Sequence, residues 1–343
     1  MSYYDGTKLL SMTDIEGNKP ELFLCTTNRT GGKTTWFTRF LIKKFLEKAG
    51  KFAVLYRFNY ELDDCADKIF KDVQGLFFPN YQMKAEKRGR GAYAELFLNE
   101  KSCGYALTLN AADQIKKYSH LLCDTERMFM DEFQSETNNY CKGELSKFIS
   151  IHTSLARGQG EQTKYLPVYM AANPVSLLNP YYVGLNVCSR LTDKARFVRG
   201  RGYVIEQGFV ESASEAQKES GFNKAFSDNK YVAYAHENVY LNDSKTFIEK
   251  VSGYGKYLAT LKYEGRTYGI VEHLEQGIIY CTNKADLSFP YKITVSTSDH
   301  NVNYVMLKSN DLFLMRMRYY FEKGCFRFKD LRCKEAILKA LSY

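Results

Sequence analysis

The sequence contains little that is typical of metal-binding or disulfide-rich proteins. None of its nine cysteines forms a pair with the CxxC spacing of a zinc site, and their number is odd. Its five histidines are isolated, without the close spacing of a metal-binding pair. These absences argue against the common zinc folds and favour reduced, mostly buried thiols, as in a cytosolic protein.

The sequence also lacks a long apolar run. Its longest uncharged stretch, residues 165–189, contains three prolines and three asparagines, which do not suit a helix that spans lipid. The first 17 residues carry acidic side chains and lack a basic segment followed by an apolar one, so we expect no signal peptide. We therefore expect no membrane contact. No internal repeat or low-complexity segment is visible.

The composition is that of an ordinary globular protein, with 45% hydrophobic and 25% charged residues. At roughly 150 residues per domain, the length of 343 residues predicts about two domains. Aromatic residues make up 15%, enough for a large core in each domain. The 48 lysines and arginines exceed the 39 acidic residues, and the net charge of +9 is compatible with a polyanionic partner.

Strands and helices are predicted to alternate through the first 208 residues. The predicted strands are 21–26, 52–58, 105–109, 127–131 and 166–171, the predicted helices are 34–48, 60–73, 111–118 and 143–155, and 81–99 is a predicted hairpin. This alternation is typical of an α/β fold with a mostly parallel sheet.

The pattern changes after about residue 208. A polar segment follows, in which 212–226 is predicted to be an exposed helix. Three strand-like segments with short connectors, 257–263, 267–271 and 277–281, predict an antiparallel meander, and two helical stretches, 310–322 and 330–341, follow. We therefore divide the chain into a first domain (1–205), a linker (206–240) and a smaller α+β domain (241–343).

The most informative motif is TNRTGGKT at positions 27–34, between a predicted buried strand and a predicted amphipathic helix. A loop in this place can direct backbone N–H groups at phosphates, and Gly31 and Gly32 permit a close approach. Lys33 supplies positive charge for the β- and γ-phosphates, and the Thr34 hydroxyl can ligate Mg²⁺. The predicted nucleotide-binding residues of this segment are Thr27, Asn28, Arg29, Thr30, Gly31, Gly32, Lys33, Thr34 and Thr35. Thr27 replaces the usual first glycine, and a chance GGKT in a loop is the alternative.

An acidic pair ends the predicted strand 127–131. Asp131 would hold Mg²⁺ through water, and Glu132 would act as the general base that activates the attacking water. A pair of acids that caps a helix is the alternative. The predicted strand 105–109 lies between the two motifs in the sequence. We take it to favour the additional-strand, catalytic-glutamate branch of P-loop ATPases over the kinase branch.

Three further polar residues have candidate roles around a triphosphate. Asn173 follows the next predicted strand and can sense the γ-phosphate, although Asn-Pro also initiates turns, and the two roles are compatible. An arginine inserted at the transition state contributes about 10³–10⁵ in rate. The candidates are Arg29, inside the loop, and Arg157, whose Gly-rich segment follows a predicted helix and can reach a neighbouring subunit; a solvated turn residue is the alternative for Arg157.

Basic residues suggest where nucleic acid would bind. Those on the predicted hairpin are Lys84, Lys87, Arg88 and Arg90, and the RGRG pattern recurs at 199–202. Ordinary hairpins also carry Arg and Gly at turns. Residues 301–343 contain nine basic and four acidic residues, an excess of positive charge that fits either a solvated surface or a contact with nucleic acid or a portal.

The second domain lacks the carboxylate pattern of a two-metal nuclease. Such a site needs an acid on the first central strand, and the predicted strand 257–263 has none. The acids Glu264, Glu272, Glu275, Asp286 and Asp299 are predicted to lie in loops on a solvated surface.

These segments resemble the genome-packaging ATPases (encapsidation proteins) of small short-tailed phages of the phi-twenty-nine type. The resemblance covers most of the chain. It is carried by TTNRTGGKT, MFMDEF, HTSLAR, AANPVSLLNPYY, FIEK and YEGRTYGIVEHLEQGIIY, in that order. The segments outside the phosphate loop are more specific than the loop itself.

The resemblance implies an ATPase domain, a short helical linker and an RNase H-like domain without useful nuclease activity. It implies ATP and Mg²⁺ at Lys33 and Thr34, Asp131 and Glu132 as the acidic pair, and Arg157 as an arginine finger that acts on a neighbouring subunit. It also implies a ring, usually pentameric, on the portal of a procapsid, with double-stranded DNA and, in the type member, a structural RNA as partners. The protein would then occupy the host cytoplasm, bind the procapsid transiently and be absent from the mature virion.

We therefore expect an ATP-driven translocase that packages viral double-stranded DNA. One alternative is another P-loop ring motor, either helicase-like or of the DNA-segregation type. A nucleotide kinase and a structural protein with an inactive nucleotide site are the other two alternatives. The general base Glu132 and the basic second domain argue against the kinase.

Overall fold

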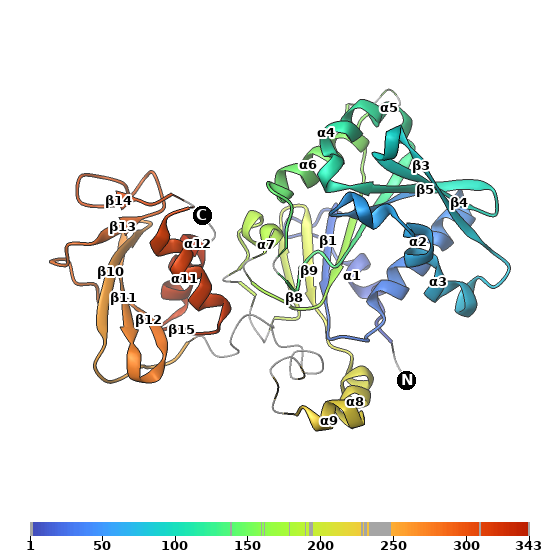
Figure 1. Ribbon diagram of the computed structural model, residues 1–343. Helices are drawn as coiled ribbons and strands as arrows, with labels where there is room; N and C mark the ends of the chain where they lie inside the picture. The colour runs from blue at the N-terminus through green and yellow to red at the C-terminus, as the bar shows by residue number, and fades with distance from the viewer. Residues whose placement is uncertain are drawn as a thin grey trace. The chain divides into compact units, whose positions relative to one another are not determined.

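The computed structural model describes residues 3–137, 139–158, 160, 162–177, 179–188, 190–191, 195–227, 229, 232, 248–308 and 310–341. The chain divides into two compact units, Met1–Pro174 with Ala195–Asn238 and Val175–Lys194 with Val239–Tyr343 (Figure 1). Residues 175–194, which we assigned to the first domain, thus group with the second unit. Within the described residues, no helix combines the length and apolarity needed to cross a bilayer.

The first unit is built on a nine-stranded sheet in the order β3-β4-β5-β2-β6-β7-β1-β9-β8. Its strands are β1 (Leu22–Thr26), β2 (Lys51–Tyr56), β3 (Met83–Arg88), β4 (Tyr93–Leu98), β5 (Lys101–Thr108), β6 (Thr125–Asp131), β7 (Val168–Ala172), β8 (Phe197–Gly200) and β9 (Tyr203–Gln207). The six strands from β5 to β9 in this order are parallel, and antiparallel strands lie at both edges. The predicted α/β fold with a mostly parallel sheet and an 81–99 hairpin is confirmed.

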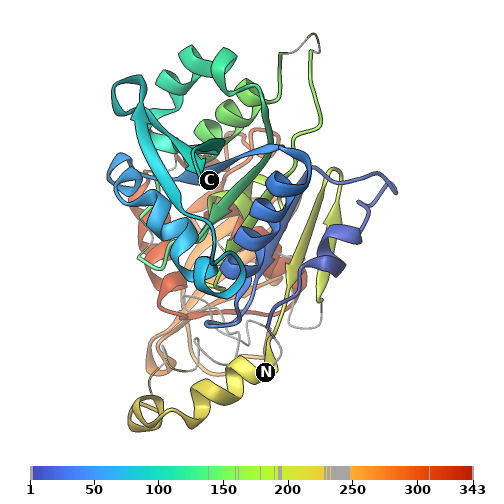
Figure 2. The same ribbon diagram turned by 90° about the vertical axis from the view of Figure 1, so that its right-hand side faces the viewer.

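Helices cover both faces of this sheet (Figures 1 and 2). The helices of the first unit are α1 (Thr7–Ser11), α2 (Lys33–Lys48), α3 (Cys65–Phe77), α4 (Ala112–Ile115), α5 (Ser119–Leu122), α6 (Glu144–Leu155), α8 (Glu211–Glu219) and α9 (Gly221–Ala225), of which α8 and α9 lie beyond the end of the sheet. The crossovers that contain α2 and α3 run along the sheet in one direction, and those that contain α4, α5 and α6 run in the other. Because parallel crossovers are right-handed, the two groups lie on opposite faces.

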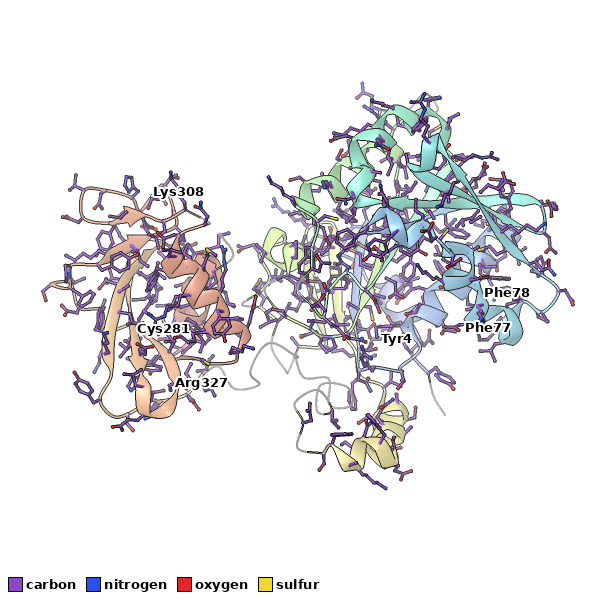
Figure 3. The ribbon with its side chains drawn as sticks, in the orientation of Figure 1. Tyr4, Phe77, Phe78, Cys281, Lys308 and Arg327 are labelled. Atoms are coloured by element: carbon purple, nitrogen blue, oxygen red, sulfur yellow. The ribbon has the colours of Figure 1, made fainter. Side chains whose placement is uncertain are left out.

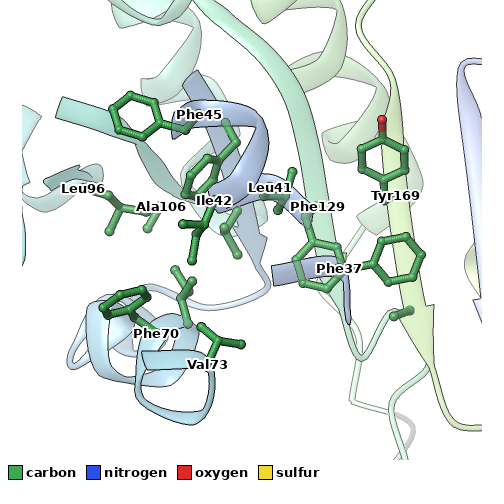
Figure 4. Packing of buried hydrophobic residues seen from close by; sticks show 14 of the residues in the cluster. Phe37, Leu41, Ile42, Phe45, Phe70, Val73, Leu96, Ala106, Phe129 and Tyr169 are labelled. Carbon is green, nitrogen blue, oxygen red and sulfur yellow. The ribbon is translucent and has the colours of Figure 1, made fainter. Parts of the chain in front are cut away.

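The helix after the phosphate loop is fixed to the sheet by a large apolar contact (Figure 4). Phe37, Leu41 and Ile42 lie on one side of α2 and are buried in the core. The ring of Phe37 lies 5.6 Å from that of Phe129 on β6 and 5.8 Å from that of Tyr169 on β7. Since each buried side chain of this size contributes about 1.5–3 kcal/mol, the contact holds the start of α2 in a fixed place beside the ends of these strands.

The predicted helix over 60–73 is interrupted. Residues 59–62 form a 3₁₀ turn, η1 (Asn59–Leu62), and α3 begins only at Cys65. Asp64, between the two, has a left-handed backbone with φ of +57°. An α-helix of L-residues cannot continue through that conformation.

The strand that we used to assign the ATPase branch lies elsewhere in the sheet. The predicted 105–109 strand belongs to β5, which pairs with β2 on the side away from β1. The strand between β1 and β6 is β7. The sequence position of a strand does not fix its place in a sheet, so the reason given for the branch was wrong.

The predicted linker begins inside the first unit. Its first residues belong to β9, which pairs with β1 along its whole length. Val210 and Ala213 are buried in the same core as α2, and the predicted exposed helix over 212–226 is two helices, α8 and α9. Any linker therefore starts after Ala213.

The second unit contains a six-stranded sheet in the order β14-β13-β10-β11-β12-β15. Its elements are α7 (Pro180–Gly184), β10 (Lys256–Tyr263), β11 (Arg266–His273), η5 (Leu274–Gln276), β12 (Ile278–Thr282), β13 (Lys292–Thr294), β14 (Val305–Met306), α11 (Leu312–Glu322), β15 (Phe326–Phe328) and α12 (Leu331–Leu341). The antiparallel pairing of β10, β11 and β12 confirms the predicted meander. Both closing helices are also confirmed.

Two acids of this unit that we expected on a solvated surface are instead buried. Glu272 lies on β11 and pairs with Arg316 at 3.1 Å. The Asp299 carboxylate accepts hydrogen bonds from the N–H groups of Glu264 (2.7 Å) and Gly265 (2.9 Å). Asp299 thus stabilises the β10–β11 turn, in which Gly265 has a left-handed φ of +73°.

Candidate nucleotide site

The phosphate loop joins β1 to α2 and contains two left-handed residues. Thr30 has φ of +59°, and Gly32, immediately before the helix, has φ of +87°. Left-handed backbone favours glycine, and a Cβ added at Gly32 would lie 3.2 Å from the ring of Tyr3. The turn therefore favours the second glycine of the motif, and a larger residue there would also require the ring of Tyr3 to shift.

Two interactions hold the loop from outside. The Asn28 side chain exchanges hydrogen bonds with the backbone of Val210, donating at 3.0 Å and accepting at 2.9 Å. The N–H of Tyr4 donates to the carbonyl of Gly31 at 2.8 Å, and its hydroxyl donates to buried Glu206 at 2.9 Å. The loop is thus fixed to the segment after β9 and to the N-terminal segment.

Not every predicted nucleotide-binding residue faces the site. The side chains of Thr27 and Asn28 are completely buried, and neither they nor Gly31 line the cavity at the loop. The buried Asn28 amide binds the backbone of Val210, so the side chain is directed away from the cavity, and a contact between Asn28 and nucleotide stays a prediction. The other predicted members do line the cavity: Arg29, Thr30, Gly32, Lys33, Thr34, Thr35 and Asn173.

Asn28→Ala is expected to lower the free energy of unfolding of the first unit by about 1–3 kcal/mol, because it leaves buried backbone groups of Val210 without their partners. Urea unfolding followed by fluorescence of Trp36, the single tryptophan, measures this unit selectively. The exposed Asn18→Ala is the control and should change stability by less than about 0.5 kcal/mol. Equal stability of the two variants would contradict the assigned role of Asn28.

Lys33 meets Asn173 at the carboxyl ends of two adjacent strands. The Lys33 ammonium donates to Oδ1 of Asn173, which follows β7, at 2.6 Å. Lys33 is only 7% exposed, and this burial lowers the pKa of its ammonium, an effect that the nearby Asp131 carboxylate opposes. A buried cation held by a neutral amide is well suited to receive an anionic phosphate.

The acidic pair lies at the end of β6. Burial raises the pKa of the Asp131 carboxyl, while the Thr34 hydroxyl and the Lys33 ammonium oppose the rise. Glu132 has a left-handed φ of +51°, and its N–H donates to Oδ1 of Asp131 at 3.0 Å. Burial raises the pKa of Glu132, and repulsion from Asp131 and Glu136 adds to the effect. A carboxylate with raised basicity is what a general base requires.

Arg29 is paired within the same chain. Its guanidinium forms an ion pair with Glu136, and Glu136 also accepts from the Asn173 amide at 3.5 Å. Glu136 therefore connects Arg29 to the residue that contacts Lys33. The sequence analysis did not identify Glu136, since nothing in a polar loop marks one acid among several.

One cavity of about 790 Å³ lies at the phosphate loop. Its lining includes the polar and charged residues Lys33, Thr34, Asp131 and Glu132. Aromatic and apolar residues from three segments also line it, namely Tyr3, Tyr4, Trp36, Leu76 and Phe77, together with the charged residues Arg39 and Asp72. Tyr4 and Phe77 are labelled in Figure 3. A cavity that combines convergent polar groups with aromatic side chains has the character of a ligand-binding site.

Two residues of this lining also suit Mg²⁺. The Thr34 hydroxyl and the Asp131 carboxylate are hard oxygen ligands. Within the part of the chain that the structure describes, no three His, Cys, Asp or Glu residues gather as a metal cage. Mg²⁺ is commonly held by one or two protein oxygens together with phosphates and water, and these residues fit that pattern.

Arg157 lies near the amino-terminal ends of the parallel strands, opposite to the ends that carry the nucleotide site. Lys164, whose N–H donates to the carbonyl of Ala156 at 2.7 Å, also donates from its ammonium to the carbonyl of Thr125 at 2.8 Å. Thr125 begins β6 and Asp131 ends it, roughly 20 Å further along the strand. The structure therefore does not bring Arg157 to the nucleotide site of its own chain.

The basic residues of the 81–99 hairpin are mostly paired with acids. Lys84 pairs with Glu100 at 2.9 Å, Lys87 with Asp63, and Arg88 with Glu86 at 2.6 Å. Arg90 is in the turn itself, with φ of +59°. Acidic partners reduce the positive field that this hairpin presents, which weakens the case for a DNA contact there.

This chain matches the family model described as podovirus DNA encapsidation protein (Gp16) over residues 1–341. The DNA packaging protein of Bacillus phage phi29 is 24% identical over 308 residues, covering 87% of this chain and 86% of that protein. The DNA packaging protein of Bacillus phage B103 is 24% identical over 316 residues, covering 91% and 92%.

Solved structures share the fold. The bacteriophage Phi-29 viral genome packaging motor assembly contains a chain that is similar with a TM-score of 0.58 and 21% identity over 97% of each chain. A chain of the Phi-28 gp11 DNA packaging motor gives a TM-score of 0.58 and 17% identity over 99% of this chain and 96% of that one. Because the family model matches nearly the whole length, this chain belongs to the podovirus DNA encapsidation protein (Gp16) family.

Proposed function

We propose that this protein is the ATP-hydrolysing subunit of a motor that packages double-stranded DNA into a phage procapsid. The main support is the convergence of Lys33, Asn173, Asp131 and Glu132 at the carboxyl ends of neighbouring strands. The DNA packaging proteins among its relatives supply the link to DNA.

The loop and the polar residues of the cavity would bind the triphosphate, and its aromatic residues would bind the base. Lys33 and the loop N–H groups would hold the β- and γ-phosphates. Tyr3, Trp36 and Phe77 offer flat surfaces for a purine. Mg²⁺ held by Thr34 and Asp131 would neutralise charge that develops on the phosphate oxygens.

Glu132 would take the proton of the attacking water, as in the additional-strand, catalytic-glutamate class of P-loop ATPases. The strand that supports this class is β7 and not the 105–109 strand, because β7 lies between β1 and β6 and is followed by Asn173. Asn173 would contact the γ-phosphate. Arg29 would leave Glu136 and add positive charge to the nucleotide site of its own chain. Arg157 would add positive charge to the site of a neighbouring subunit, since it lies near the amino-terminal ends of the strands in its own chain, away from its own site.

The second unit would be an RNase H-like domain without nuclease activity. In the order β12-β11-β10-β13-β14, an antiparallel meander is followed by two strands parallel to β10, which is the arrangement expected of that fold. Glu272 and Asp299 have the structural contacts described above, and β10 carries no acid. Residues after Ala213 and before the second unit would form the linker.

The assembly would be a ring, pentameric in our expectation, on the procapsid portal. Double-stranded DNA would pass through it, and a structural RNA would be a further partner. The motor would work in the host cytoplasm and leave before the virion matures. The packaging-motor assembly to which this fold is similar supports such an arrangement.

The test combines ATP turnover with packaging. With cognate procapsids, we expect duplex DNA to stimulate phosphate release and to become resistant to added nuclease. Lys33→Ala should lower both by at least about 100-fold, because a phosphate-binding charge is removed. Lys48→Ala, at the exposed end of the same helix, should leave both unchanged. Phosphate transfer to a small acceptor without DNA stimulation would instead identify a kinase.

A further inference from the structure

Arg57, directly after β2, makes a set of contacts that the nucleotide chemistry does not explain. Its Nε donates to both carboxylate oxygens of Glu144, at 3.1 and 3.2 Å. Its two terminal nitrogens donate to the carbonyl oxygens of Glu132 (2.7 Å) and Phe133 (2.6 Å). One buried guanidinium thus joins three separate segments, and two of its bonds go to the turn that carries Glu132.

The anchor of this arrangement is itself fixed. Glu144 is the first residue of α6, and its side chain is only 1% exposed. It also accepts from the N–H of Cys141 at 2.9 Å. The Tyr140 ring centroid lies 5.0 Å from the Arg57 guanidinium, within the range of a cation–π contact. Arg57 therefore has a rigid place from which to hold the turn.

The turn needs such support. Glu132 is a non-glycine residue with φ of +51°, a conformation that persists only where the surroundings enforce it. The Phe133 N–H donates to the carbonyl of Ala171 on β7 at 3.2 Å, while Arg57 binds the carbonyls on the other side. Without Arg57, Glu132 can relax toward ordinary backbone, and its carboxylate moves with it.

We propose that Arg57, held by Glu144, is a positioning residue that keeps the Glu132 carboxylate in place for hydrolysis. The proposal rests on the proposed ATPase function. It assigns Arg57 no contact with nucleotide or DNA, because its guanidinium is buried and its N–H groups bind Glu144, Glu132 and Phe133. Hydrolysis requires the Glu132 carboxylate in one place, and that place depends on the left-handed backbone of Glu132. The guanidinium of Arg57 maintains this backbone through its bonds to the carbonyls of Glu132 and Phe133.

The test removes the ion pair without leaving a lone buried charge. Truncating Arg57 alone would strand Glu144 and risk misfolding. We therefore choose Arg57→Met with Glu144→Gln, because the Gln keeps an acceptor for the Cys141 N–H. The matched control is Arg127→Met with Glu126→Gln, which removes an ion pair of 3.0 Å near the other end of β6.

Three measurements on the full-length protein separate positioning from folding. Relative to wild type, the Arg57/Glu144 variant should keep its melting temperature within a few degrees and its Mg-nucleotide dissociation constant within about threefold. Its single-turnover phosphate release should fall at least about 100-fold, the scale of a general-base contribution. The single change Arg57→Lys retains the positive charge and a hydrogen-bond donor beside Glu144, so this variant should release phosphate faster than the Arg57/Glu144 double variant and more slowly than wild type. The control pair should change none of these.

A second test uses Glu132→Gln as the background. If Arg57 acts through Glu132, removing the Arg57/Glu144 pair should not slow the residual rate further. If removing the pair in the Glu132→Gln background lowers the residual rate by the same factor as in the wild-type background, the proposal is overturned. So would wild-type hydrolysis by the folded double variant. If the wild-type protein releases no phosphate under any condition, the ATPase proposal fails first, and that result is distinct from an active wild type with an equally active variant.

Discussion

Glu132→Gln is expected to bind Mg-ATP with nearly wild-type affinity and to release phosphate at least about 100-fold more slowly, since the amide cannot accept the proton of water. The left-handed backbone at Glu132 and its N–H bond to Asp131 do not depend on the carboxylate, so the geometry of the turn is kept. Binding measured with a fluorescent ATP analogue and single-turnover phosphate release give the two quantities separately.

The control for this change is Glu126→Gln, on the same strand but near its other end and exposed. It should leave both the affinity and the rate unchanged. Loss of binding together with rate in Glu132→Gln would contradict the role of general base, because that role concerns the chemical step alone. Retained turnover would place the base elsewhere.

Arg157→Ala is expected to lower the turnover of the assembled motor by about 10³–10⁵, the contribution of an arginine that stabilises phosphoryl transfer. The expectation rests on its position: it lies beside the start of β6, away from its own nucleotide site, in a segment able to face a neighbour. If so, a subunit that supplies Arg157 but cannot bind nucleotide should complement one that binds nucleotide but lacks Arg157.

Mixtures of Arg157→Ala and Lys33→Ala subunits should therefore show more activity than either variant alone, with an optimum at intermediate ratios. Lys48→Ala, the exposed change used above as a control, should keep full activity here as well. Absence of rescue at every ratio, in assemblies shown by cross-linking to contain both variants, would argue against action between subunits.

The sequence predicts the parts of the site that depend on local patterns. The buried strand before residue 27, the amphipathic helix after it and the apolar strand ending at Asp131 each have a clear signature, and all three are confirmed. Their meeting at one edge follows from the rule for parallel strands. The order of strands does not, because it depends on contacts between residues far apart, and β7 rather than β5 separates β1 from β6.

The supporting residues carry no local signal at all. Arg57 and Glu144 are 87 positions apart, and Tyr4 and Glu206 are 202 apart. Each is an ordinary charged or aromatic residue until the fold brings it to its partner. The strands β13, β14 and β15 contain only two or three residues, too few for a period to show, whereas the meander was predictable from its longer strands and short turns.

The central claim is that Lys33 and Asp131, from segments far apart in the sequence, act on one Mg-ATP. Phosphate release from Mg-ATP in the presence of duplex DNA and procapsids, measured for the wild type, Lys33→Ala and Asp131→Asn, tests it most directly. We predict steady turnover by the wild type and a loss of at least about 100-fold in each variant. Wild-type rates in both variants, or no phosphate release by the wild type, would contradict the account.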